Sequence, residues 1–507
     1  MSNGQLLSDY FTKIAKNPVP LVPYSPQALK VLSSWVENEQ LTPSALFAAI
    51  ALGGPQSSQG WSTVKPGPFM FPQDHGPHWD IRNEWYYLAC NMTYTDAKGV
   101  SNPLYLLLAI IRRGTSPDNQ TPKAQIVACE FTAELPGTST PYVTQSSAFD
   151  GFTSQVLMQA PSPTQDFQWS VFDGQQLFGI NSPASPDSLS AFNVGVAFTH
   201  PTLGPVNCQL NLISTVQPAY FLQGDNGCAP CLDGVGYRYY SWPALTVQNG
   251  STVTVGTSTY NCQGQAWLDH QWGSRMQPLG YVDNLYLRAL AVLGNSYPKE
   301  LAPQWDWFFM HLSNGMHITT AVLPSQGFFN SSEGAPVPLT NTTFITTGSG
   351  TLSTQTFQGG TVTYRGWQRI NCNWYASSWV LQWPNVTLNL VVTQSGTDAG
   401  VSRGVDGQSF MEKGINVSGT VNGVAVTGVG FAEAVGYDPL ETQVAELLTT
   451  MFGDTTLAQQ YVSVFMPASA SAGDIALASL LVVGPPLVLL IIIVTVVVVV
   501  LKKKKKL

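Results

Sequence analysis

Short stretches of apolar and alternating residues, each the length of a β-strand, recur along the chain from about residue 61 onward. Residues 84–91 and 104–112 are rich in aromatic and branched side chains, and the turn-forming stretch 95–99 joins them as a hairpin. Similar stretches follow at short intervals, separated by glycine, proline and asparagine. This spacing predicts an all-β protein built from antiparallel barrels or sandwiches.

The strand pattern runs through two consecutive parts of the chain. The first part, residues 61–277, ends soon after a tyrosine-rich stretch. The second part, residues 278–440, contains another predicted hairpin with strands at 305–312 and 316–322. Because 507 residues exceed one typical domain, we predict two β-domains, one from each part.

Both ends of the chain depart from this pattern. Residues 1–60 predict a short helical region, because serine–proline and threonine–proline pairs precede its apolar runs. Residues 441–470 predict a helix and a linker. Residues 475–501 form an apolar run long enough to cross ~30 Å of hydrocarbon, and the lysine tail 502–507 follows it. We therefore predict a C-terminal transmembrane helix that anchors the chain to a membrane.

Such an anchor implies a single-pass protein of the endoplasmic reticulum or another endomembrane. The lysine tail favours a cytosolic C-terminus, and Lys504 and Lys505 resemble a dilysine retrieval signal, so the β-domains would lie in the lumen. The first residues lack the pattern of a signal peptide, and insertion by the tail would instead leave the β-domains in the cytosol. The sequence leaves both topologies open.

Composition narrows the range of partners and cofactors. Only 10% of the residues are charged, against ~25% in an ordinary soluble protein, and the net charge of −8 argues against nucleic-acid binding. The closely spaced pair Cys228 and Cys231 lacks the second pair that a zinc site needs. The sequence has no serine-hydrolase elbow, no HExxH and no glycine-rich dinucleotide loop after a strand. We predict no metal, no cofactor and no nucleic-acid partner.

One segment carries the candidate chemistry. Asp269 and His270 are adjacent, and Trp267 and Trp272 flank them. A carboxyl group among large rings is partly desolvated, which raises its pKa and lets it act as a proton donor near neutral pH. The structural alternative is that Asp269 accepts turn hydrogen bonds while the two tryptophans are core residues.

Several motifs, in one order along residues 80–440, resemble those of the AttH-like and hydroxyneurosporene synthase (carotenoid hydratase) family. The matching pieces are residues 83–87 (NEWYY), Arg112, residues 239–241 (YYS), residues 264–273 (GQAWLDHQWG), residues 305–315, residues 412–414 (EKG) and residues 428–437. Tyr86 and Met411 stand where the family motifs carry tryptophan. The resemblance implies two consecutive lipocalin-like antiparallel β-domains, in agreement with the strand pattern.

The resemblance also implies a function, because members of this family or fold include carotenoid hydratases, the fungal kievitone hydratase and fungal cyclases. By this resemblance Asp269 protonates a carbon–carbon double bond of a hydrophobic terpenoid, carotenoid or polyketide, and His270 orients Asp269 or relays the proton. Water then adds to the cation, or a ring closes. The expected substrate-binding residues are Glu84, Trp85, Tyr240, Trp267 and Trp272.

Two other expectations follow from the pattern. Glu412 and Glu433 are expected to close the second domain as structural groups, and His311 and His317 to be solvated beside a hairpin turn.

The enzyme function has an alternative in a different class, a non-catalytic, membrane-tethered carrier of a lipid or pigment, because lipocalin-like barrels hold small ligands readily. A third alternative is a purely structural protein.

Overall fold

The computed structural model describes the chain between residues 61 and 435. Within these limits the description omits residues 63, 65–66, 115–119, 123–124, 152–153, 184–188, 215, 225, 231–235, 274–304, 323–335, 358, 371–372, 394–400 and 404–408. The predicted regions 1–60, 441–470, 475–501 and 502–507 lie outside the described residues. Among the described residues, no helix is both long enough and apolar enough to cross a membrane.

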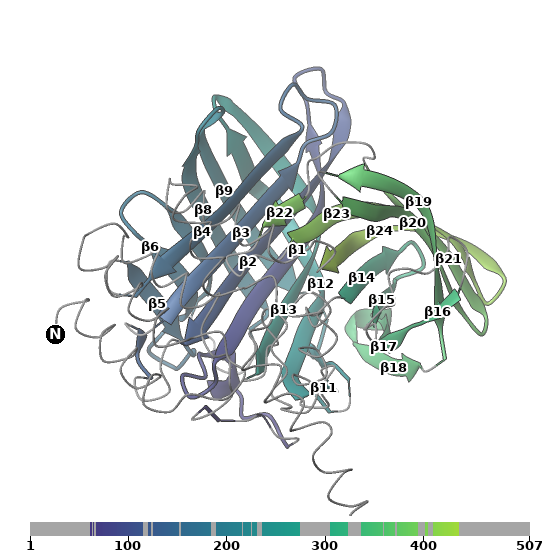
Figure 1. Ribbon diagram of the computed structural model, residues 1–507, viewed down its shortest axis with the longest axis horizontal. Coiled ribbons are helices and arrows are strands. Elements are labelled where there is room, and N and C mark those ends of the chain that lie inside the picture. The colour runs from purple at the N-terminus through teal and green to yellow at the C-terminus, as the bar shows by residue number, and fades with distance from the viewer. Residues whose placement is uncertain are drawn as a thin grey trace, which may run out of the picture.

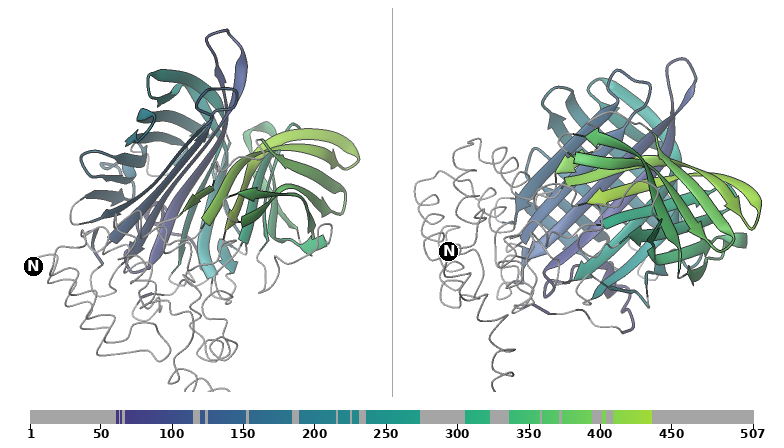
Figure 2. Two further views of the ribbon diagram at one scale, coloured as in Figure 1. Left: turned by 45° about the horizontal axis from the view of Figure 1, so that its top comes forward. Right: turned by 45° about the vertical axis from the view of Figure 1, so that its right-hand side comes forward.

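The first of two antiparallel sheets curls around its own core (Figures 1 and 2). Its strands are β1 (Asn83–Thr95), β2 (Ser101–Gly114), β3 (Gln125–Glu134), β4 (Tyr142–Asp150), β5 (Gln155–Gln159), β6 (Phe167–Phe172), β7 (Leu177–Ser182), β8 (Ala191–His200), β9 (Gly204–Ser214), β10 (Phe221–Leu222), β11 (Cys228–Pro230), β12 (Gly236–Val255) and β13 (Ser258–Gly273). The main path is β4-β3-β2-β1-β13-β12-β9-β8-β7-β6-β5, and a short 3₁₀ helix, η1 (Gln73–His75), precedes β1.

The second sheet curls around a separate core and lies against the outer face of the first (Figure 2). Its strands are β14 (Trp305–Leu312), β15 (Met316–Val322), β16 (Pro336–Pro338), β17 (Thr340–Thr346), β18 (Ser353–Phe357), β19 (Thr361–Ile370), β20 (Asn373–Trp383), β21 (Val386–Val392), β22 (Val401–Arg403), β23 (Ser409–Val421) and β24 (Val424–Val435). The main path is β16-β19-β20-β21-β23-β24-β14-β15-β17-β18, and η5 (Gly348–Gly350) is a second short 3₁₀ helix.

The pattern of buried and exposed residues along each strand shows which of its faces packs on a core. β9 alternates buried and exposed residues, as expected of a strand with one face on the core and one in water. β1 is buried on both faces over most of its length, because its inner face lines the first core and its outer face meets the second sheet. The strands β1 and β13, paired in register from Asn83 opposite Gly273, therefore separate two different buried environments.

Aromatic residues form the contact between the two sheets. Trp267 of β13 stacks on Phe309 of β14 with ring centroids 5.2 Å apart, and Tyr87 of β1 meets Trp307 edge to face. Phe431 of β24 joins the same cluster. Burying these rings is worth ~1.5–3 kcal/mol each, so the two sheets are joined by a true core.

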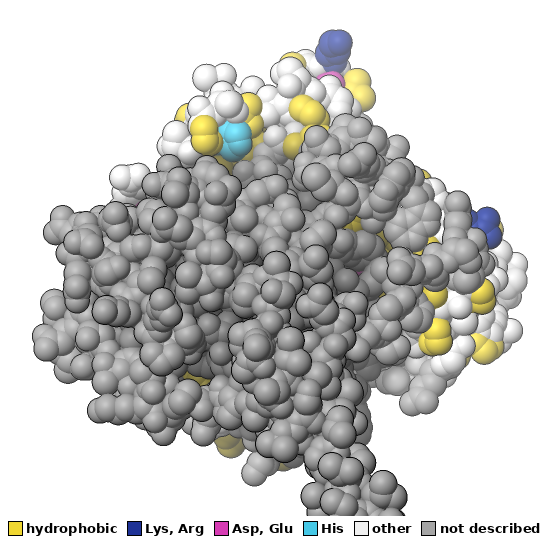
Figure 3. Space-filling model, in the orientation of Figure 1, with side chains coloured by type: hydrophobic (Ala, Val, Ile, Leu, Met, Phe, Trp, Pro, Cys, Tyr) yellow, Lys and Arg dark blue, Asp and Glu magenta, His cyan; other side chains and the backbone are white. Residues whose placement is uncertain are grey.

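The structure confirms the all-β fold and both predicted hairpins, β1–β2 and β14–β15. The expectation of solvated histidines is wrong. His311 and His317 are buried, and their Nδ1 atoms lie 2.6 Å apart across the β14–β15 pair, because the second sheet turns that side toward the first. In the view of Figure 3, the described side chains are mainly apolar or uncharged, in keeping with the composition.

Candidate functional site

The alternation of side chains along β13 divides the predicted site residues between two places. Asp269 points to the outer face, where Trp267 donates a hydrogen bond to it, whereas His270 points into the first core. Of the expected substrate-binding residues, Trp85 and Trp267 share the face of Asp269. Glu84, Tyr240 and Trp272 share the face of His270. His270 therefore does not hydrogen-bond to Asp269, and the two residues belong to different networks.

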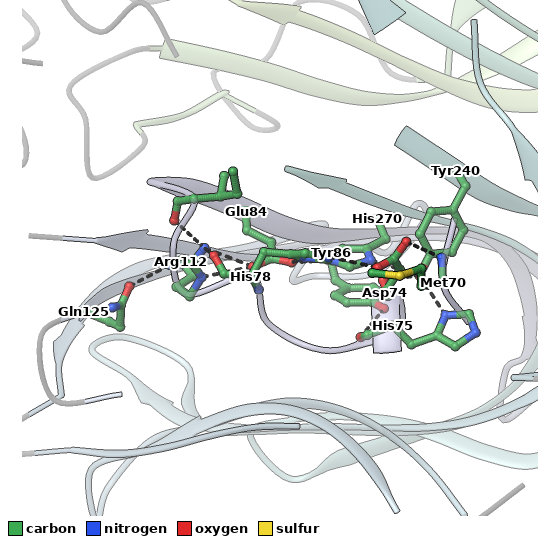
Figure 4. A network of polar contacts seen from close by, with 11 residues as sticks. Met70, Asp74, His75, His78, Glu84, Tyr86, Arg112, Gln125, Tyr240 and His270 are labelled. Carbon is green, nitrogen blue, oxygen red and sulfur yellow. Dashed lines mark hydrogen bonds and ion pairs between the residues drawn. The ribbon is translucent and has the colours of Figure 1, made fainter. Parts of the chain in front are cut away.

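The first place is an interior network that joins the segment before β1 to strands β1, β2, β12 and β13 (Figure 4). Its members are Asp74, His75, His78, Glu84, Tyr86, Arg112, Tyr240 and His270. It gathers three of the six histidines of the chain in a protein with few charges. Such a concentration of ionisable groups in a core is costly unless the groups are paired.

Glu84 is the centre of the interior network. Its Oε2 accepts hydrogen bonds from Arg112 Nε at 3.1 Å and Nη2 at 3.0 Å, and its Oε1 lies 2.6 Å from His78 Nδ1. Burial alone would raise the pKa of Glu84, but the charges of His78 and Arg112 and the hydrogen bonds from His270 and His78 hold it well below its usual value. Glu84 is thus a carboxylate at neutral pH and not a proton donor.

Because Glu84 is a carboxylate, it determines which nitrogen of His270 carries a proton, and hence the hydrogen bond that His270 makes with Tyr240. Burial lowers the pKa of His270 to about 4, so this imidazole is neutral and carries one N–H. His270 Nε2 lies 3.0 Å from Glu84 and donates to it, so Nδ1 must accept the hydrogen bond of 2.9 Å from Tyr240. The Tyr240 oxygen in turn accepts from His75 Nδ1 at 2.7 Å. The Tyr240 hydroxyl also lies 3.1 Å from the Asp74 carbonyl oxygen, which is a second acceptor for its single proton.

Rings enclose the interior network. Trp272 stacks on His78 with centroids 4.0 Å apart, Tyr86 stacks on His270 at 4.1 Å, and Phe71 stacks on His75 at 4.5 Å. The stacking holds each imidazole in one orientation. His78, Glu84 and His270 are also the one group of described residues whose ligand atoms could hold a metal ion.

The second place is an outer site around Asp269, between the two sheets. Asp269 Oδ1 accepts hydrogen bonds from Ser241 and from Trp267 Nε1 at 2.7 Å, and Oδ2 lies 2.8 Å from the Tyr239 hydroxyl. Gln223 donates to Ser241 Oγ at 2.9 Å, so the Ser241 hydroxyl must donate to Asp269. Burial raises the pKa of Asp269 to about 7 against the opposing effect of these hydrogen bonds.

Two glutamates of the second sheet extend the outer site. Glu412 of β23 accepts a hydrogen bond of 2.8 Å from the Tyr87 hydroxyl, and Glu433 of β24 accepts one from Trp305. Both face the first sheet, so the expectation that they close the second domain is wrong. Burial raises the pKa of Glu433 to about 7, and burial together with Glu433 raises the pKa of Glu412 well above its usual value.

A groove opens on the same outer face, further along β1 and β13. It has a volume of about 460 Å³ and is lined by Asn91, Tyr105, Gln263 and, from the second sheet, Val429. Both polar atoms of the Asn91 side chain are buried and have no hydrogen-bond partner among the described residues. On this face of β13, Gln265 and the buried Trp267 lie between Gln263 and Asp269, which are about 20 Å apart along the strand.

Sequence reasoning missed His75 and His78. They lie before the first strand, in the stretch PQDHGPHWD, outside the motifs that carried the resemblance. The available clue was composition, because two of only six histidines occur within four residues of one another beside two aspartates.

The sequence matches the AttH-like family over residues 62–437. A crystal structure of an AttH protein from Nitrosomonas europaea is 18% identical, covers 74% of this chain and 99% of its own, and superposes with a TM-score of 0.51. Kievitone hydratase from Nectria haematococca is 15% identical over 75% of this chain and 97% of its own, with a TM-score of 0.45. No curated protein matches the chain in sequence. The family match spans well over half of the sequence, and the chain belongs to the AttH-like family.

Proposed function

We propose that this protein is a cofactor-independent hydratase or cyclase that protonates a double bond of a hydrophobic substrate, with Asp269 as the acid. The observation that carries the proposal is the geometry of the outer site. Ser241 and Trp267 both donate to Oδ1, whereas Oδ2 has only the rotatable Tyr239 hydroxyl beside it at 2.8 Å, so Oδ2 is the oxygen that carries the proton when the acid is neutral. A buried carboxyl group without a cation beside it favours its neutral form.

The surroundings of Asp269 suit the step that follows protonation. Trp267 packs at the contact between the sheets with Trp307 and Phe309 around it. A carbocation against such rings gains ~2 kcal/mol or more of cation–π attraction when it is desolvated. The hydrogen bonds to Oδ1 stabilise the carboxylate that remains after proton transfer. Water, or a second double bond of the substrate, then attacks the cation.

In this proposal the substrate enters by the groove on the outer face. Its volume of about 460 Å³ falls within the range of small-molecule sites, and the unpartnered Asn91 amide offers a polar contact there. A substrate that enters the groove reaches Asp269 only if Trp267 moves. The predicted anchor at 475–501 fits the proposal, because a membrane concentrates apolar substrates near the protein.

The first test is to purify the full chain in detergent, extract its apolar ligand and identify the ligand by mass spectrometry. Incubation of that compound with the protein in heavy-oxygen water distinguishes hydration, which incorporates the label, from cyclisation, which does not. Asp269→Asn should fold, bind the compound and turn it over at least about 100-fold more slowly. Undiminished turnover in Asp269→Asn refutes the acid, and a ligand that is never converted indicates a carrier.

A further inference from the structure

We propose that His78, Glu84 and His270 form a binding site for one divalent transition-metal ion, for which Zn²⁺ is the natural probe. The three residues offer ligand atoms that all lie within 4.8 Å of one another. His78 Nδ1 and His270 Nε2 both point at the same atom, Glu84 Oε1, at 2.6 and 3.0 Å. Two imidazoles and one carboxylate are a ligand set that zinc uses, with a fourth position open.

Each of the three ligands has an outer partner that would hold it in a binding orientation. Asp74 Oδ1 lies 3.4 Å from His78 Nε2, which gives the carboxylate–histidine pair common behind metal ions. Arg112 binds the other oxygen of Glu84 and leaves Oε1 for the metal. Stacking of Tyr86 on His270 fixes that ring. The neighbouring residues therefore hold all three ligand side chains in orientations that suit metal binding.

The hydrogen bonds can rearrange without leaving a buried polar group unpaired. A metal on His270 Nε2 moves the ring proton to Nδ1, which then donates to the Tyr240 oxygen. The Tyr240 hydroxyl then turns to the Asp74 carbonyl oxygen, which lies 3.1 Å away. His78 gives its Nδ1 proton to solvent, as histidine ligands do on binding metal.

The charges also balance. Arg112 opposes a cation, but it is already paired with Glu84 and with the carbonyl oxygens of His78 and Ile81. Asp74 adds a second carboxylate on the far side of His78. Two carboxylates against one guanidinium and a divalent ion leave one positive charge, which an anionic fourth ligand such as hydroxide neutralises.

The site is independent of the proposed acid, because Asp269 points to the opposite face of β13. It also differs from the other buried histidine pair. His311 and His317 offer two nitrogens only 2.6 Å apart and no carboxylate among their described partners, which makes them a matched control.

The test uses the full chain, stripped with a chelator and titrated with Zn²⁺ by calorimetry and with Co²⁺ by visible absorption. We expect about one ion per chain and a d–d spectrum typical of nitrogen and oxygen ligands. His78→Ala and His270→Ala should each weaken binding by about 100-fold or more, and Asp74→Asn by about 10-fold. His311→Ala and Asp269→Asn should bind as the wild type does.

His78 is partly buried in the irregular segment between η1 and β1, outside the sheets, so its replacement by alanine keeps the test valid if the His270 variant fails to fold. The absence of saturable binding to the folded wild type overturns the proposal. So does binding that survives unchanged in folded His78→Ala, which would assign the ion to another part of the chain.

Discussion

The buried pair of glutamates between the sheets predicts that this protein loses stability as pH rises from about 4.5 toward neutrality. Glu412 and Glu433 lie directly opposite one another on the paired strands β23 and β24. Their side chains are 1% and 9% exposed, so water screens their mutual repulsion poorly. Like charges opposite each other in a sheet are unfavourable, and the pair avoids them by keeping a proton.

Among the described residues, the groups known to contact or act on the pair do not supply a compensating positive charge. Tyr87 of β1 and Trp305 of β14 are neutral donors, and the other groups that act on the pair are acids. These acids are Glu130 of β3, Asp269 of β13 and Asp306 of β14. The raised pKa values therefore follow from burial and from neighbouring acids, and no nearby cation offsets them among these contacts.

The sign and size of the effect follow from proton linkage. Between pH 4.5 and about 7 the folded protein binds a proton at Glu433 that the unfolded chain has released, so stability falls over this window as pH rises. A pKa raised from 4.5 to about 7 corresponds to ~3 kcal/mol of folding free energy at pH 8. Glu433→Gln removes this penalty and keeps an acceptor for Trp305.

Urea unfolding of the full chain, followed by tryptophan fluorescence at pH 5 and pH 8, measures the effect. We expect Glu433→Gln to be ~2–3 kcal/mol more stable than the wild type at pH 8 and nearly equal to it at pH 5. Asp173→Asn, in an exposed turn, is the control for net charge. The reasoning is refuted if Glu433→Gln is less stable than the wild type at pH 8. It is also refuted if the stability of the variant depends on pH as strongly as that of the wild type, because the proton held by Glu412 and Glu433 would then not cause the pH dependence.

Three further changes test the packing and the anchor. Gly414→Ala should lower the free energy of unfolding by ~1–3 kcal/mol, because its new methyl group would overlap the Tyr105 ring of the other sheet. Arg112→Lys should cost ~3 kcal/mol in chemical unfolding, since lysine cannot make the paired hydrogen bonds to Glu84. Deletion of residues 475–507 should release the protein from membranes in a flotation assay, whereas the full chain should float with them.

The strand content and the hairpins were predictable because they depend on local pattern. The bounds of β14 and β15 agree with the predicted strands, since turn residues interrupt the apolar stretches there. Burial of His311 was not predictable, because it depends on the second sheet packing on the first. The position of Glu412 depends on the same packing. Contacts between distant parts of the chain leave no local pattern in a single sequence.

The motifs located some of the residues in the two buried polar networks, but not His75 or His78 and not the arrangement of the networks. The motifs located Asp269, His270, Glu84 and Tyr240, all of which have buried polar partners in the structure. Adjacency in sequence suggested that Asp269 and His270 act together. In a strand, however, neighbouring side chains point to opposite faces, so adjacency argues against contact. Alternation along the strand therefore predicts that Asp269 and His270 lie on opposite faces, as the structure shows.

A strand that is buried on both faces explains how one short motif can serve two sites. On β13, the odd-numbered Trp267 and Asp269 contribute to the contact between the sheets, while the even-numbered His270 and Trp272 line the first core. The backbone between them is held by pairing with β1 on one side and β12 on the other. A shift of one residue in that register would exchange the acid and the imidazole between the two environments. The register of β13 therefore determines which face of the sheet receives the proposed acid, Asp269, and which receives the proposed metal ligand, His270.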